Sequence, residues 1–167
     1  ILAYGNYLYV TEMGPNMYRT IQYDLENYEP KLLYSEFKGN VSISGIRNDA
    51  LFFGIFTGDP TDEQSWAKYR SNLDGQDIVT LPIQIPIVSR LLADDHYYYL
   101  NPVSWYSKSE PFAEVEEAMF IYDTNFKEVD RIDMSMMGMW AFAYPGNEQH
   151  MFFQTYDETY NYQRFYY

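Results

Sequence analysis

Short runs of alternating apolar and polar residues, each opened by a turn-forming residue, dominate the chain. Four aromatic runs stand out, at residues 6–10, 49–53, 95–99 and 149–153, and each follows Gly, Asn or Asp residues that tolerate positive φ. Alternation with a period of two residues is typical of β-strands that bury one face. The stretch "FAEVEEAMF" (112–120) is interpreted as a loop insertion with room for one helical turn before a strand. The pattern predicts an all-β protein.

The strands recur as a unit. A run of small or apolar residues precedes each aromatic run, and a strand–turn–strand element follows the first three, at 21–33, 69–81 and 120–132. Aligning the aromatic runs pairs Tyr9, Phe52, Tyr98 and Phe152, and the corresponding residues in the following element are Ile21, Tyr69 and Phe120. A unit of four strands that repeats every 45 to 50 residues or so is typical of a β-propeller blade.

We therefore expect residues 1–167 to form one β-propeller region of four-stranded antiparallel blades, with the small-residue strand innermost. The approximate blades are 1–38, 39–83, 84–135 and an incomplete 136–167. About three and three-quarter blades are then visible, and we expect the chain to be part of a larger propeller. A β-sandwich, which also uses short alternating strands and regular turns, is the alternative.

The hairpin "YRSNLDGQDIVTL" (69–81) is the sharpest copy of the repeated turn, and Gly75 is expected to adopt positive φ there. With Lys68 it resembles the hairpin of TolB-like and YWTD-type propellers, although "YYYLNP" and "LFFGIF" stand where the YWTD tetrad would be. The resemblance implies a bacterial cell-envelope or secreted protein, including lipoproteins whose lipid anchor would lie outside this chain. It also implies a scaffold that binds a ligand.

Composition narrows the function. The formal net charge is −13 with no basic patch, which argues against nucleic acid and anionic membranes as partners. The chain has no cysteine, so disulfides, thiolate metal sites and cysteine nucleophiles are excluded. No apolar run is long enough for a membrane helix. The opening "ILAYGNYLYV" lacks a basic n-region, so no signal peptide is expected in it, and a mature piece of a secreted protein would fit.

Three groups of residues are candidates for chemistry. His96 and His150 fall at equivalent strand starts, and a metal site there would need carboxylates that the pattern does not place. The loop 57–66 carries Asp59, Asp62 and Glu63, which suit either Ca²⁺ or, as we favour, a solvated acidic loop. The Met-rich "MSMMGMW" (134–140) is interpreted as core packing. We predict no metal site, no cofactor and no catalytic residue.

The candidate ligand-binding residues are aromatic and acidic side chains of two loops: Trp66, Trp105, Tyr106 and Glu110. Trp and Tyr dominate binding hot spots and stack on sugar rings. We expect a non-catalytic scaffold that binds a protein or a glycan. One alternative is a carbohydrate-active hydrolase or lyase, which would use paired carboxylates from the loop 101–117. Another is that both Trp side chains only anchor their own loops.

Overall fold

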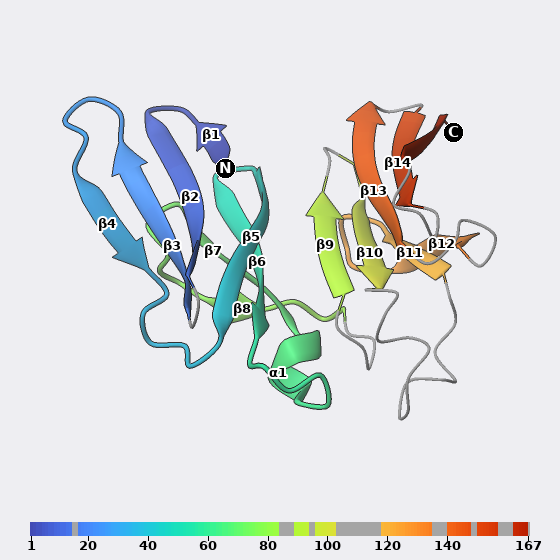
Figure 1. Cartoon of the computed structure of the whole chain (residues 1–167), viewed down its shortest axis with the longest axis horizontal. Coiled ribbons are helices and arrows are strands. Elements are labelled where there is room, and N and C mark those ends of the chain that lie inside the picture. The colour runs from blue at the N-terminus through green and yellow to red at the C-terminus, as the bar shows by residue number, and fades with distance from the viewer. Residues whose placement is uncertain are drawn as a thin grey trace. The chain divides into compact units, whose positions relative to one another are not determined.

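The structure is a computed structural model that describes residues 1–14, 17–83, 89–93, 96–102, 118–134, 140–147, 150–156 and 162–166. Side chains are described over 1–12, 19–83, 89–93, 96–101 and 118–134. The chain forms two compact units, residues 1–84 and 85–167. Both units are built from antiparallel sheets, so the expected all-β class is confirmed (Figure 1). No helix of the described residues is long and apolar enough to cross a membrane.

Unit 1 contains two four-stranded sheets, each with its strands in chain order. Sheet 1 comprises β1 (Leu2–Tyr4), β2 (Tyr7–Gly14), β3 (Met17–Asp24) and β4 (Pro30–Leu33). Sheet 2 comprises β5 (Asn40–Arg47), β6 (Ala50–Phe56), β7 (Lys68–Asn72) and β8 (Val79–Thr80). A one-turn helix, α1 (Glu63–Trp66), lies in the connection between β6 and β7 and was not predicted.

Unit 2 repeats the arrangement. Its four-stranded sheet contains β9 (Ser89–Ala93), β10 (Tyr98–Pro102), β11 (Ala118–Tyr122) and β12 (Glu128–Asp133), again in chain order. A three-stranded sheet follows with β13 (Trp140–Asn147), β14 (His150–Tyr156) and β15 (Tyr162–Tyr166). Each of the four sheets falls inside one of the ranges expected from the repeat. Of the predicted insertion "FAEVEEAMF", residues 112–117 lie outside the described residues and 118–120 open β11.

The core of unit 1 forms where sheets 1 and 2 face each other. Alternation along the strands sends Tyr9 and Leu33 from sheet 1 toward Leu51 and Phe53 of sheet 2, and all four side chains are buried. Tyr34, directly after β4, packs on Phe53 with ring centroids 4.2 Å apart. Stacked sheets of this kind gain stability mainly from the apolar area that the two inner faces remove from water.

The turn between β7 and β8 locks the two sheets together. The backbone carbonyl of Leu73 accepts hydrogen bonds from the Tyr9 hydroxyl (3.1 Å) and from the Gln22 side-chain amide (2.9 Å). Both donors are buried, and Gln22 Nε2 also lies 3.2 Å from the Tyr9 hydroxyl oxygen. On the surface, Lys31 and Asp74 form an ion pair at 3.0 Å. The buried Tyr9 hydroxyl and Gln22 amide therefore have partners inside the interface, as burial requires.

The third and fourth strands of each complete sheet are joined by variants of one turn. Asn72 opens the turn in sheet 2, where its side-chain oxygen accepts from the amides of Asp74 (3.0 Å) and Gln76 (2.8 Å). Asp123 accepts in the same way from the amides of Asn125 and Lys127 in the β9–β12 sheet. Asp24 opens the corresponding turn of sheet 1, which is one residue longer, and accepts from the amide of Glu26. Asn and Asp side chains fix such turns by replacing a backbone acceptor.

One residue near the end of each turn has positive φ: Tyr28 (60°), Gly75 (74°) and Phe126 (62°). The prediction for Gly75 is thus confirmed. A non-glycine residue in this region costs about 1 kcal/mol because its Cβ crowds the following carbonyl oxygen. Phe126 offsets that cost by stacking on Tyr98, with ring centroids 4.9 Å apart.

The register of the third copy differs from the prediction. Tyr9 lies opposite Gln22, two residues before the turn-opening Asp24, and Phe52 lies opposite Arg70, two residues before Asn72. In the β9–β12 sheet, Tyr99 rather than Tyr98 lies opposite the residue that is two positions before Asp123. Tyr99 is accordingly the counterpart of Tyr9, and it joins the buried cluster of that sheet with Met119 and Met134. A shift of one residue moves a side chain to the opposite face, so Tyr98 was wrongly aligned.

Replacing Gly75 tests the turn. Gly75→Val should lower the free energy of unfolding by more than about 1 kcal/mol, because valine resists positive φ. Its Cβ would also stand 3.2 Å from Cδ2 of Leu33, so the inter-sheet packing must adjust. Gly5→Val is the matched control, since Gly5 has φ +56 but no other group lies within 4 Å of the place that a Cβ would take. Chemical denaturation should show the larger loss for Gly75→Val, and an unchanged midpoint would contradict the turn's role.

Candidate functional site

The connection 57–67 between β6 and β7 is the one predicted binding loop that the structure describes. It closes around Ser65, whose buried hydroxyl donates to the Asp59 carbonyl at 2.9 Å. The same oxygen accepts from the Thr57 amide at 3.2 Å and lies 3.1 Å from the Thr57 hydroxyl. These hydrogen bonds connect the two ends of the loop and constrain its conformation.

The acidic side chains of this loop act as local hydrogen-bond acceptors. Asp59 Oδ1 accepts from the Thr61 hydroxyl (2.7 Å) and the Thr61 amide (2.8 Å), and these bonds hold the pKa of Asp59 below its usual value. Asp62 is the N-cap of α1 and accepts from the Gln64 amide at 2.9 Å. Over the described part of the chain, no three His, Asp or Glu side chains come together as a metal site requires.

Trp66 is half-buried at the end of α1. Its indole N–H donates to the Pro60 carbonyl at 2.7 Å, so the side chain folds back along its own loop. The contact anchors the loop, as one of the alternatives above expects. It leaves part of the ring in reach of a ligand, and the binding role of Trp66 stays a prediction.

The other predicted residues fall elsewhere. Trp105, Tyr106 and Glu110 lie outside the described residues. His96 is exposed just before β10 and packs its ring edge against Tyr97, with centroids 6.3 Å apart. The side chain of His150 is outside the described side chains, so the two histidines cannot be compared. Met134, the first methionine of "MSMMGMW", is buried in the core of its sheet, as expected for that position.

Lys68 is a feature of this region that the sequence did not reveal. It opens β7, directly after the loop, and its side chain is almost completely buried. The amine donates to the Trp66 carbonyl at 2.8 Å and lies 3.5 Å from the Ala67 carbonyl oxygen. Lys68 thus holds the backbone at the C-terminal end of α1 and helps to fix the position of Trp66.

Burial has a large effect on the Lys68 amine. Desolvation disfavours the charged form and lowers the pKa of Lys68 to about 7. The sequence offers no signal for this, because Lys68 alternates with Tyr69 in a strand that also contains the exposed Arg70. The two carbonyl acceptors beside the amine come from the folded loop, which no local pattern predicts.

Comparison with known proteins concerns the fold alone. No protein-family model and no curated protein matches the sequence. Among solved structures, the chain is similar to one from a study of two prolyl endopeptidases, with a TM-score of 0.53 and 12% sequence identity. The match covers 95% of this chain but only 22% of the other, and that protein contains a β-propeller domain. The chain therefore spans about a fifth of the length of its structural relative.

The pKa of Lys68 predicts a pH-dependent penalty on stability. Below pH 7 the amine is charged in both the folded and the unfolded chain, and burial of that charge costs on the order of 5 kcal/mol. Between pH 7 and about 10.5 the unfolded chain binds a proton that the folded chain does not, so this cost fades as pH rises. Lys68→Met should therefore raise the free energy of unfolding most at pH 6, with the gain shrinking toward pH 10.

Lys31→Met serves as the control, since Lys31 is exposed and forms a surface ion pair with Asp74. Denaturant titrations of both variants and of the wild type at pH 6, 8 and 10 measure the difference directly. A gain from Lys68→Met that is equal at all three pH values would mean that the amine is solvated in the folded protein.

Proposed function

We propose that this chain forms blades of a β-propeller. Four antiparallel sheets follow one another along the chain, and the described strands run in order within each. Within unit 1 the first strand of sheet 1 contacts the first strand of sheet 2, and within unit 2 β9 contacts β13. Adjacent first strands fit an arrangement in which β1, β5, β9 and β13 line a central axis. The similarity to a propeller-containing protein over 95% of the chain supports the same arrangement.

The propeller acts as a scaffold that binds a protein or a glycan, and it does so with loops at the β6–β7 end of the sheets. The observation that carries this proposal is the hydrogen-bonded loop 57–67, which carries the half-buried Trp66 near its end and whose Trp66 carbonyl accepts from the buried Lys68 amine. A rigid aromatic side chain loses little entropy when it contacts a ligand. Trp105, Tyr106 and Glu110 belong to the corresponding loop after β10, and we propose the same binding role for them. The resemblance of the hairpin 68–81 supports a location in the bacterial envelope or outside the cell.

A carbohydrate-active enzyme is the weaker proposal. Glycoside hydrolysis needs two carboxyl groups that flank a sugar bond, one of them free to donate a proton. The carboxylates expected for such an enzyme belong to the loop 101–117, of which residues 103–117 lie outside the described residues. The described loop 57–67 does not supply a substitute pair, because Asp59 and Asp62 accept hydrogen bonds from Thr61 and Gln64 and the pKa of Asp59 is lowered, which is the wrong direction for an acid. The activity named for the structural relative is not carried over either, because a likeness at 12% identity reflects the fold.

Trp105→Ala tests the binding proposal. We expect it to weaken binding by about tenfold or more if the indole is a hot spot, because such residues supply most of the contact energy. Trp66→Phe is the companion variant, which keeps a ring but removes the hydrogen bond to Pro60. Leu32→Ala is the control, since Leu32 is exposed on the outermost strand of sheet 1. Wild type and variants are compared on a glycan array and in pull-downs.

Each variant is first checked for its melting temperature, so that loss of binding is separated from loss of folding. Equal binding by the wild type, Trp105→Ala and Trp66→Phe in every assay would remove this surface from consideration. Loss of binding by Leu32→Ala as well would show that the assay reports folding rather than contact.

A further inference from the structure

The three related turns differ in what surrounds their positive-φ residue. Gly75 is buried, and a Cβ there would stand within 3.5 Å of Leu33 and Tyr34, so only glycine fits. Phe126 stacks on Tyr98, a contact inside its own unit. Tyr28, in contrast, is 74% exposed. Its backbone has the same unfavourable conformation, with φ 60°, although most of the residue is in contact with solvent. Backbone conformations of this kind cluster at functional sites.

The turn that carries Tyr28 is stiff. The Tyr28 amide donates to the Asp24 carbonyl at 2.7 Å, and the Leu25 amide donates to the Asn6 carbonyl at 2.7 Å. The Asn6 side chain in turn donates to Glu26 Oε1 at 2.7 Å. The β1–β2 and β3–β4 turns thereby support each other, and they hold the backbone that carries the exposed Tyr28 side chain. Leu25, which is 40% exposed, lies in the same turn.

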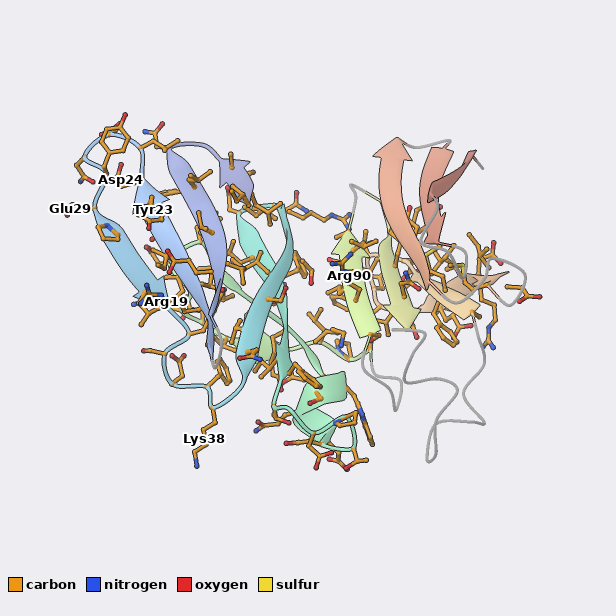
Figure 2. The ribbon with its side chains drawn as sticks, viewed as in Figure 1. Arg19, Tyr23, Asp24, Glu29, Lys38 and Arg90 are labelled. Atoms are coloured by element: carbon orange, nitrogen blue, oxygen red, sulfur yellow. The ribbon has the colours of Figure 1, made fainter. Side chains whose placement is uncertain are left out.

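The charge around this ring has one sign. The turn 24–29 contains Asp24, Glu26 and Glu29 and no basic residue. Asp24 and Glu29 lie together at the end of sheet 1 that is far from Lys38 (Figure 2). The nearest basic residue along the chain, Lys31, is paired with Asp74. Among the described side chains, no Lys or Arg forms an ion pair with Glu26 or Glu29.

We propose that Tyr28 and Leu25, with the carboxylates of Glu26 and Glu29, form a docking surface for a polypeptide segment that carries Arg or Lys. A guanidinium or ammonium group on the Tyr28 ring would make a cation–π contact, and the carboxylates beside it would add charge complementarity. Apolar side chains of the segment would cover Leu25. This surface lies at the opposite end of the strands from the loop 57–67 (Figure 1). The result of its test therefore does not decide the binding role proposed for that loop.

The decisive variant is Tyr28→Gly, which installs the residue that the equivalent turn of sheet 2 already has. Because glycine adopts positive φ without strain, the melting temperature should stay the same or rise by about 2–4 °C. The probe is a fluorescein-labelled peptide in which Arg and Leu alternate with Gly, with a counterpart that has Glu in place of Arg. Fluorescence polarisation at moderate salt should show that the wild type binds the Arg peptide in preference to the Glu peptide.

Tyr28→Gly should weaken binding of the Arg peptide at least about fivefold, and Tyr28→Phe should retain it, because the contact uses the ring rather than the hydroxyl. Phe126→Gly is the matched control: it changes the same turn position, but it should lower the melting temperature and leave peptide binding unchanged. The proposal is overturned if the wild type binds neither peptide or both equally, or if Tyr28→Gly binds like the wild type. A lower melting temperature for Tyr28→Gly would also overturn it, since the ring would then serve the fold.

Discussion

The backbone carbonyl of Leu73 is the point on which the stacking of sheets 1 and 2 depends. Two buried donors, the Tyr9 hydroxyl and the Gln22 amide, converge on this one oxygen from sheet 1. The carbonyl is in place because Asn72 shapes the turn with its side chain and Gly75 supplies positive φ. If the turn adopted another shape, the buried Tyr9 hydroxyl would lose its acceptor, at about 1–3 kcal/mol, and the Gln22 amide would keep only the Tyr9 oxygen as a partner. A local turn thus sets the register between two whole sheets, and the apolar core around Tyr9 and Phe53 forms to that register.

Local signals explain how much of the fold the sequence predicts. Alternation and turn residues are properties of neighbouring positions, and they placed each sheet within its expected range and Gly75 at positive φ. The error at Tyr98 has an equally local cause. Tyr97, Tyr98 and Tyr99 are consecutive, so any of them satisfies a pattern that asks for an aromatic residue. Only the position of the turn-opening Asp123 decides between them, because the pairing of β10 with β11 is fixed relative to that residue.

The candidate site was less predictable because its contacts are made by the folded loop. The acidic residues of 57–66 were interpreted as a solvated loop, with Ca²⁺ ligands as the alternative, but the pattern did not show that Asp59 and Asp62 accept hydrogen bonds from groups two residues away. Lys68 reads as a surface residue of a strand, and its burial follows from backbone carbonyls that the loop delivers. Likewise, the sequence alone does not show that the turn position of Tyr28 differs from those of Gly75 and Phe126. The three positions differ in how far the fold buries them. The binding role of Trp105 and Tyr106 remains a prediction.

The central claim is that successive sheets are blades with their first strands innermost around one axis. Because the chain has no cysteine, pairs of spin labels can be placed without background. One pair joins first strands, with Ser42→Cys on β5 and Arg90→Cys on β9. The other joins last strands, with Val79→Cys on β8 and Asp130→Cys on β12, and all four positions are exposed. Double electron–electron resonance should give a shorter distance for the first pair than for the second, since blades diverge outward from their axis. Equal distances, or a shorter distance between the last strands, would contradict the propeller.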